Sequence, residues 1–141
     1  MKKDIYLYLS WLVAMTSTAG SFFFSNYMKL PPCNLCWYQR VFMFPLILVL
    51  GVGYLIKDKN IHLYSLPIIF CGWLIAFYHN LIYYKWISAE LIPCTGGVSC
   101  TERQLDLFGF LSIPMMSFFS FTALLVLILL HLLKGKSYET R

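Results

Sequence analysis

The sequence contains very little charge. Only 12% of its 141 residues are Asp, Glu, Lys or Arg, whereas 60% are apolar and 18% are aromatic. The mean hydropathy is accordingly high, at +0.70. Soluble domains carry about 25% charged residues, so this chain has too few to coat a water-facing surface. The shortage excludes a soluble globular enzyme, a disordered tail and a nucleic-acid-binding module.

Charged residues are scarcest in four long stretches, at about residues 5–24, 38–56, 63–84 and 108–133, which together contain only Arg40. A helix needs about 20 residues to cross a hydrocarbon core about 30 Å thick, and these stretches have about that length. They also lack the polar face that a helix in a soluble bundle would need. The sequence therefore predicts an all-α integral membrane protein. We expect a four-transmembrane-helix bundle that forms a single membrane domain over residues 1–141.

The basic residues predict how this bundle is oriented. Seven of the 11 Lys and Arg residues fall in the two tails and the short middle loop, which four spans place on one side. The positive-inside rule then puts both termini in the cytoplasm and the loops at about 25–37 and 85–107 outside a cell membrane. The apolar run after Met1-Lys2-Lys3 also resembles a secretory signal peptide, although it is long for one.

Four of the five cysteines fall in the two predicted outward loops. Cys33 and Cys36 are in the first loop, and Cys94 and Cys100 are in the second. Cys71 lies within a predicted span, where we expect it to be a small packing residue. Disulfides persist outside the cytoplasm, so one interpretation is a pair of structural disulfides.

Three features favour redox-active pairs instead. Cys33 and Cys36 form a Cys-X-X-Cys, whose small ring stabilises a fold little and whose thiolate chemistry is often tuned. Pro31-Pro32 before the pair and an apolar helix after it predict that both cysteines lie at a helix amino end, where the dipole favours a thiolate. The short, glycine-containing loop from Cys94 to Cys100 is typical of labile disulfides.

The sequence gives little support for a bound metal or a soluble cofactor. Four cysteines can form a zinc site, but the second pair has five residues between its members and neither pair has a nearby His. A c-type haem would need His where Trp37 stands. No Gly-rich dinucleotide motif follows a strand. We expect no metal, and a non-enzymatic membrane protein that binds a metal through four cysteines stays as an alternative.

Oxidation of a dithiol releases two electrons and two protons, so the missing cofactor site points to an acceptor in the bilayer, a quinone. Arg40 follows Cys36 by four residues, on the same face of the predicted helix. His79 lies about one turn from the outer end of the third span. We expect Arg40 to polarise a quinone carbonyl or favour the Cys36 thiolate, and His79 to donate or relay a proton. The alternatives are a snorkelling arginine and a hydrogen-bonded interhelical histidine.

Two motifs resemble a known family. Cys-Asn-Leu-Cys-Trp-Tyr-Gln-Arg at 33–40 and Cys-Thr-Glu-Arg-Gln-Leu-Asp-Leu-Phe-Gly at 100–109 are similar to signatures of the disulfide bond formation proteins DsbB and BdbC. With four spans and short tails, the resemblance covers essentially the whole chain. It implies a membrane thiol–disulfide oxidoreductase that supports disulfide formation in exported proteins. Such an enzyme reoxidises an extracytoplasmic thioredoxin-fold (DsbA/BdbD-like) thiol oxidase and passes the electrons to ubiquinone or menaquinone.

The resemblance also implies a role for each cysteine. Cys94 would form the mixed disulfide with the partner, Cys100 would exchange with Cys33, and Cys36 would face the quinone. Gln39 departs from the acidic residue that proteobacterial members often have there. The Cys94–Cys100 spacing is shorter than in those members and resembles the compact Gram-positive form. Nothing requires more than a monomer, and a quinone reductase like vitamin K epoxide reductase stays as a second enzymatic alternative.

Overall fold

The structure is a computed structural model that describes residues 2–27, 29, 33–86, 106–107 and 111–139. The described residues form four helices and two short strands. In chain order these are α1 (Lys2–Asn26), α2 (Asn34–Leu55), α3 (Ile61–Tyr83), β1 (Asp106–Leu107), β2 (Leu111–Ser112) and α4 (Ile113–Glu139).

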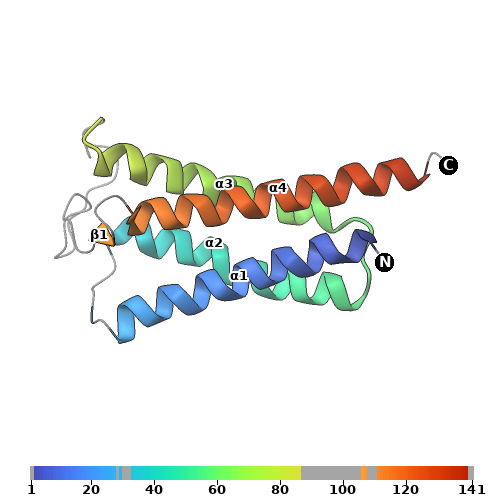
Figure 1. The fold of residues 1–141 in the computed structure, drawn as a ribbon, viewed down its shortest axis with the longest axis horizontal. Coiled ribbons are helices and arrows are strands. Elements are labelled where there is room, and N and C mark those ends of the chain that lie inside the picture. Colours follow the sequence, from blue (N-terminus) through green and yellow to red (C-terminus); the bar gives the residue numbers. More distant parts are fainter. Residues whose placement is uncertain (1, 28, 30–32, 87–105, 108–110, 140–141) are drawn as a thin grey trace.

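The four helices form an up-and-down bundle (Figure 1). Each helix packs against the next one in the chain, and α4 closes the bundle by packing against α1. The start of α1, the α2–α3 turn and the end of α4 lie at one end of the bundle, and the start of α2 and the end of α3 lie at the other (Figure 1). An even number of crossings produces this arrangement, so the basic tails and the basic middle loop share one end.

The outer surface of the bundle is apolar. Leu48, Leu55 and Leu63 are 71%, 77% and 68% exposed, and each helix contains a segment of 22 or 23 residues that is long and apolar enough to span a membrane. Exposed leucines at this density suit lipid better than water, because the hydrocarbon core is as apolar as the side chains. The predicted fold class, an all-α four-helix membrane bundle, is confirmed.

Two helix boundaries differ from the expected spans. Helix α2 begins at Asn34, four residues before the predicted span, so Cys36 is already helical. Helix α4 begins at Ile113 rather than near residue 108, because Leu111–Ser112 pair antiparallel with Asp106–Leu107. Pro114 lies in the first turn of α4, where a missing backbone N–H costs no helical hydrogen bond.

The core depends on a close approach between α3 and α4. The ring of Phe121 is fully buried against Gly72, where an added Cβ would lie 2.3 Å from Cε1 of that ring. A side chain at position 72 would therefore push α4 away from α3. Around this contact pack the other buried apolar residues of the core, Leu7, Ala14, Met43, Leu46, Leu50, Ile61, Ile69, Ala76, Leu124 and Ile128.

Lysine occupies a backbone conformation that favours glycine where α2 ends. Lys57 has φ 54°, its N–H donates to the carbonyl of Tyr54 at 3.3 Å, and the Asp58 N–H donates to the carbonyl of Gly53 at 3.0 Å. These two bonds form a Schellman motif, in which the left-handed residue is most often glycine. A side chain with a Cβ is strained there.

We therefore expect Lys57→Gly to stabilise the protein. Removing the Cβ relieves left-handed strain, so the free energy of unfolding in mixed detergent micelles should rise by about 1 kcal/mol. Lys59→Gly is the matched control, because Lys59 lies in the same turn without a positive φ. The explanation is wrong if both variants change the unfolding free energy equally.

Candidate functional site

Cys33 and Cys36 lie at the amino end of α2, as the sequence predicts. Cys33 is the N-cap residue with φ −70° and ψ 168°, and its carbonyl accepts the Trp37 N–H at 3.2 Å. Cys36 is in the first turn, and the two thiol sulfurs are 3.1 Å apart. Both are free thiols in this structure. Unpaired N–H groups at a helix amino end favour negative charge, so the pair lies where a thiolate is stabilised.

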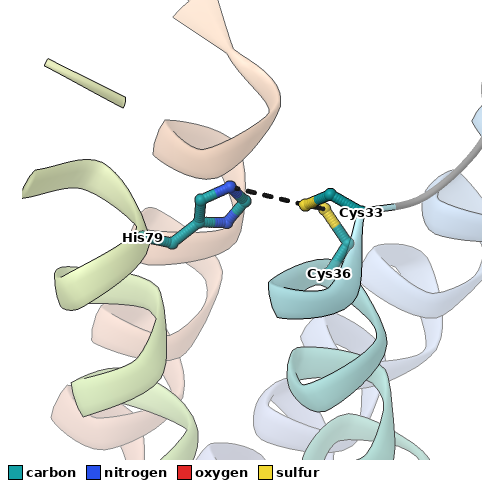
Figure 2. A group of neighbouring side chains, drawn as sticks. All are labelled: Cys33, Cys36 and His79. Carbon is teal, nitrogen blue, oxygen red and sulfur yellow. Dashed lines mark hydrogen bonds between the residues drawn. The ribbon is translucent and has the colours of Figure 1, made fainter. Parts of the chain in front are cut away.

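His79 approaches this pair from α3 (Figure 2). Its Nε2 lies 3.7 Å from the Cys33 sulfur, and the imidazole is only 2% exposed. The contact joins residues 46 positions apart in the sequence. Of the two residues expected to contact a quinone, His79 is therefore the one that contacts Cys33.

The surroundings of Cys33 favour its thiolate. A hydrogen bond from the Cys36 thiol lowers the pKa of Cys33 well below its ordinary value, and the hydrogen bond with His79 adds to the effect. Burial opposes these contributions without reversing them. A thiolate is both the nucleophile and the leaving group of disulfide exchange. Cys33 is thus prepared for that chemistry.

A cavity of about 310 Å³ lies on the other side of the pair, between α1, α2 and α4. Cys36 lines it and Cys33 does not. Its apolar walls include Met43, Phe44 and Phe121. The two sulfurs therefore have different surroundings: Cys33 contacts His79, and Cys36 borders an apolar space within the bundle.

Arg40 also lines this cavity and is held by α1. Its Nε donates to the Ser21 hydroxyl at 2.8 Å, and its Nη2 donates to the Ser21 carbonyl at 3.0 Å and to the Ser25 hydroxyl. The guanidinium also lies 5.6 Å from the centre of the Trp37 ring, within the range of a cation–π contact. A fixed positive charge therefore borders the cavity one helical turn from Cys36.

The structure separates the two residues expected to contact a quinone. Arg40 lines the cavity, whereas His79 is absent from its lining and faces Cys33. Cys71, expected to pack inside the bundle, is instead exposed on the surface of α3. Cys94 and Cys100 lie outside the described residues.

Sequence reasoning missed the part that Gln39 plays. Gln39 is 6% exposed; its Oε1 accepts the Ser117 hydroxyl at 3.0 Å, and its Nε2 is 3.3 Å from His79 Nδ1. It precedes Arg40 in the motif and follows Cys36 by three residues, which places it on the cysteine face of α2. That spacing indicates that Gln39 lies near the cysteines. The sequence does not show its partners, because they come from α3 and α4.

The same atoms bear on the metal alternative. One ring nitrogen of His79 and the sulfurs of Cys33 and Cys36 lie within 4.8 Å of one another, the one such group within the described ranges. Two sulfurs and an imidazole suit a soft or borderline metal. Elemental analysis of the purified protein tests this alternative, because stoichiometric zinc would support it.

A dithiol at a helix start, set between a buried imidazole and a cavity in an apolar four-helix bundle, defines a membrane thiol–disulfide protein. The chain belongs to the DsbB family: the family model described as "Disulfide bond formation protein DsbB" matches residues 3–131. Membership makes it a multi-pass membrane protein of disulfide formation with disulfide oxidoreductase activity.

Curated relatives are similar over nearly their whole length. The chain is 43% identical to "Probable disulfide formation protein C 2" of Bacillus anthracis, over 94% of both chains. It is 38% identical to "Disulfide bond formation protein C" of Bacillus subtilis, over 96% of both. It is 40% identical to "Probable disulfide formation protein" of Oceanobacillus iheyensis, over 94% of this chain and 90% of the relative. No solved structure matches the chain.

Proposed function

We propose that this protein reoxidises an extracytoplasmic thioredoxin-fold thiol oxidase and passes the electrons to a membrane quinone. The observation that carries the proposal is the position of Cys36, which lines an apolar cavity beside the fixed charge of Arg40. Cys33, three residues earlier, faces away from that cavity toward His79. One cysteine is thus placed for disulfide exchange and the other for electron delivery.

The cavity has the chemistry that a quinone headgroup needs. Phe44 and Phe121 belong to the apolar part of its lining, and Arg40 supplies a hydrogen-bond donor with positive charge. The Thr18 hydroxyl, from α1, is buried and has no hydrogen-bond partner in the described part of the chain. A buried polar atom without a partner is costly, and a quinone carbonyl would satisfy it. A bound quinone accepts two electrons and two protons for each dithiol oxidised.

The residues of the chain have distinct tasks in this proposal. Arg40, held by Ser21 and Ser25, presents its charge without having to reorganise when a ligand binds. The apolar walls exclude water, which strengthens that interaction. Cys36 lies one turn from Arg40, so the positive charge of the guanidinium attracts negative charge on the Cys36 sulfur.

The order of disulfide exchange follows from the family resemblance. A partner thiolate attacks Cys94 and displaces Cys100, which attacks Cys33 and displaces Cys36 as a thiolate. The second partner thiolate then releases Cys94, and Cys94 attacks Cys100 and displaces Cys33. Each step forms one S–S bond and breaks one. The partner leaves with a disulfide, and the electrons remain on the Cys33–Cys36 dithiol.

The charge distribution sets the orientation that we propose for the bundle. The α2–α3 turn, which contains Lys57 and Lys59, lies at the same end of the bundle as the start of α1 and the end of α4 (Figure 1). Lys134 is in the last two turns of α4, and its Nζ donates to the Tyr6 hydroxyl near the start of α1 at 2.5 Å. The positive-inside rule places this end in the cytoplasm of a cell membrane. The cysteine end then faces outward, where the partner is found.

One assay tests the whole proposal. The full chain in lipid nanodiscs is mixed with a reduced thioredoxin-fold protein and a water-soluble quinone, and quinone absorbance is followed while free thiols are trapped and counted. We expect one quinone reduced for each partner disulfide formed, and the same rate for Cys71→Ser, because that thiol lies outside the site. Partner oxidation without quinone consumption would overturn the assignment of the acceptor.

A further inference from the structure

A chain of side chains, buried at His79 and Gln39 and half-buried at Ser117, extends the His79–Cys33 contact into α4. Ser117 donates to Gln39 Oε1 at 3.0 Å, Gln39 Nε2 lies 3.3 Å from His79 Nδ1, and His79 Nε2 lies 3.7 Å from the Cys33 sulfur. An amide has an acceptor end and a donor end. With its oxygen occupied by the Ser117 hydroxyl, Gln39 turns its N–H group toward Nδ1.

This orientation determines which imidazole nitrogen carries the proton. An amide nitrogen only donates, so Nδ1 must present its lone pair, and the proton of the neutral ring is on Nε2. That nitrogen faces the Cys33 sulfur. We propose that Gln39 is a positioning residue that holds His79 in its Nε2–H tautomer, which makes His79 a hydrogen-bond donor to the Cys33 thiolate.

The proposed function, on which this inference rests for its chemical step, shows where such a donor acts. When Cys94 attacks Cys100, the Cys94–Cys100 bond forms, the Cys100–Cys33 bond breaks, and the electron pair goes to the Cys33 sulfur. An N–H at 3.7 Å stabilises that leaving thiolate. The other tautomer would present a lone pair there and oppose the step.

Burial makes the tautomer matter. Gln39 and His79 are 6% and 2% exposed, so water is poorly placed to replace a missing donor. Hydrogen bonds to a charged group in such surroundings are stronger than in water, and an unpaired polar atom is more costly. The orientation of the Gln39 amide therefore determines, through the tautomer of His79, whether the Cys33 sulfur receives a hydrogen bond.

Two substitutions at position 39 separate positioning from packing. Gln39→Met keeps the length of the side chain but removes both hydrogen bonds that the amide makes, to Ser117 and to His79. Gln39→Glu keeps an acceptor for Ser117 and offers His79 an acceptor as well, which favours a proton on Nδ1. If Gln39 only filled space, Gln39→Met would leave the tautomer of His79 unchanged.

The direct measurement is ¹⁵N NMR of the imidazole nitrogens in the reduced full chain in detergent micelles. His62 and His131 serve as internal references, and His79→Gln assigns the signals. We expect wild type to show the Nε2–H tautomer, Gln39→Met to show a mixture, and Gln39→Glu to show protonated Nδ1. A wild-type Nδ1–H tautomer, or identical spectra for all three proteins, would overturn the proposal.

Alkylation of Cys33 by iodoacetamide, read at the peptide level, provides the second readout. Losing a hydrogen bond to a charged group should slow the reaction of Gln39→Met at neutral pH about tenfold. Gln39→Glu should slow it at least as much, because its tautomer turns a lone pair of His79 toward the Cys33 sulfur. Ser117→Ala frees the amide without altering it and should also give mixed tautomers. Ser10→Ala is the matched control, because it removes the hydroxyl of another helical serine, a buried one that donates to the Tyr6 carbonyl.

Neither readout needs a quinone or a partner protein. If only the proposed function fails, quinone is not reduced, but the tautomer of His79 still changes with the residue at position 39. If this inference fails, quinone reduction proceeds and the imidazole spectra do not depend on Gln39. Equal alkylation rates in Gln39→Met and wild type would likewise contradict the role of His79 as a donor to Cys33.

Discussion

Replacing Cys36 with serine should lower quinone reduction to the uncatalysed background. The hydroxyl of serine is a far poorer leaving group than a thiolate and forms no disulfide, so position 36 can no longer store the electron pair. Cys33 would stay intact beside His79, and exchange with Cys100 would still be open to it. We therefore expect Cys36→Ser to accumulate a Cys33–Cys100 bridge, detected as a cross-linked peptide by mass spectrometry.

Two control variants make this result specific. Cys71→Ser removes a thiol on the exposed surface of α3 and should keep the wild-type rate. Cys33→Ser should also be inactive, but without the bridged peptide, because the exchanging sulfur is then missing. Quinone reduction by Cys36→Ser at more than about a tenth of the wild-type rate would remove Cys36 from the electron path.

The sequence predicts the scaffold because hydropathy is a local property. Four charge-poor stretches of spanning length suffice to give the helices, and Pro31-Pro32 marks where the cysteine-bearing helix begins. The helix dipole near Cys33 follows from that start alone. None of these inferences requires knowing how one helix is rotated against another.

The division of the site could not be predicted, because it depends on that rotation. Whether His79 faces Cys33 or the cavity is set by how α3 packs on its neighbours, which includes the close approach of Phe121 to Gly72. Equally, the bonds of Arg40 to Ser21 cross from α2 to α1, 19 positions apart in sequence. Hydropathy and spacing within one helix carry no information on such contacts.

Gln39 illustrates the difference between noticing a residue and knowing its role. The family motif marks it as a departure from an acidic residue and suggests altered charge near Arg40. In the structure its amide contacts Ser117 and His79 instead. These two partners come from different helices. They indicate that an amide in place of an acidic residue changes the direction of the hydrogen bond to His79.

Replacing Arg40 with alanine should raise the apparent KM for quinone about tenfold to hundredfold, the range expected for one hydrogen bond to a charged group. The KM for the reduced partner should change less than twofold, because Arg40 faces the cavity and α1. Initial rates measured while each substrate is varied separately give both constants. Equal increases in the two constants would count against a contact between Arg40 and quinone.

Arg40 also holds α1, so an effect on the fold must be separated from an effect on the ligand. The double variant Ser21→Ala and Ser25→Ala removes side-chain acceptors of Arg40 but leaves the charge and the Ser21 carbonyl bond. If the charge binds quinone, this variant should lose part of the unfolding free energy and raise the quinone KM less than Arg40→Ala does. If Arg40 acts only by anchoring α1, both variants should raise that KM in proportion to their loss of stability.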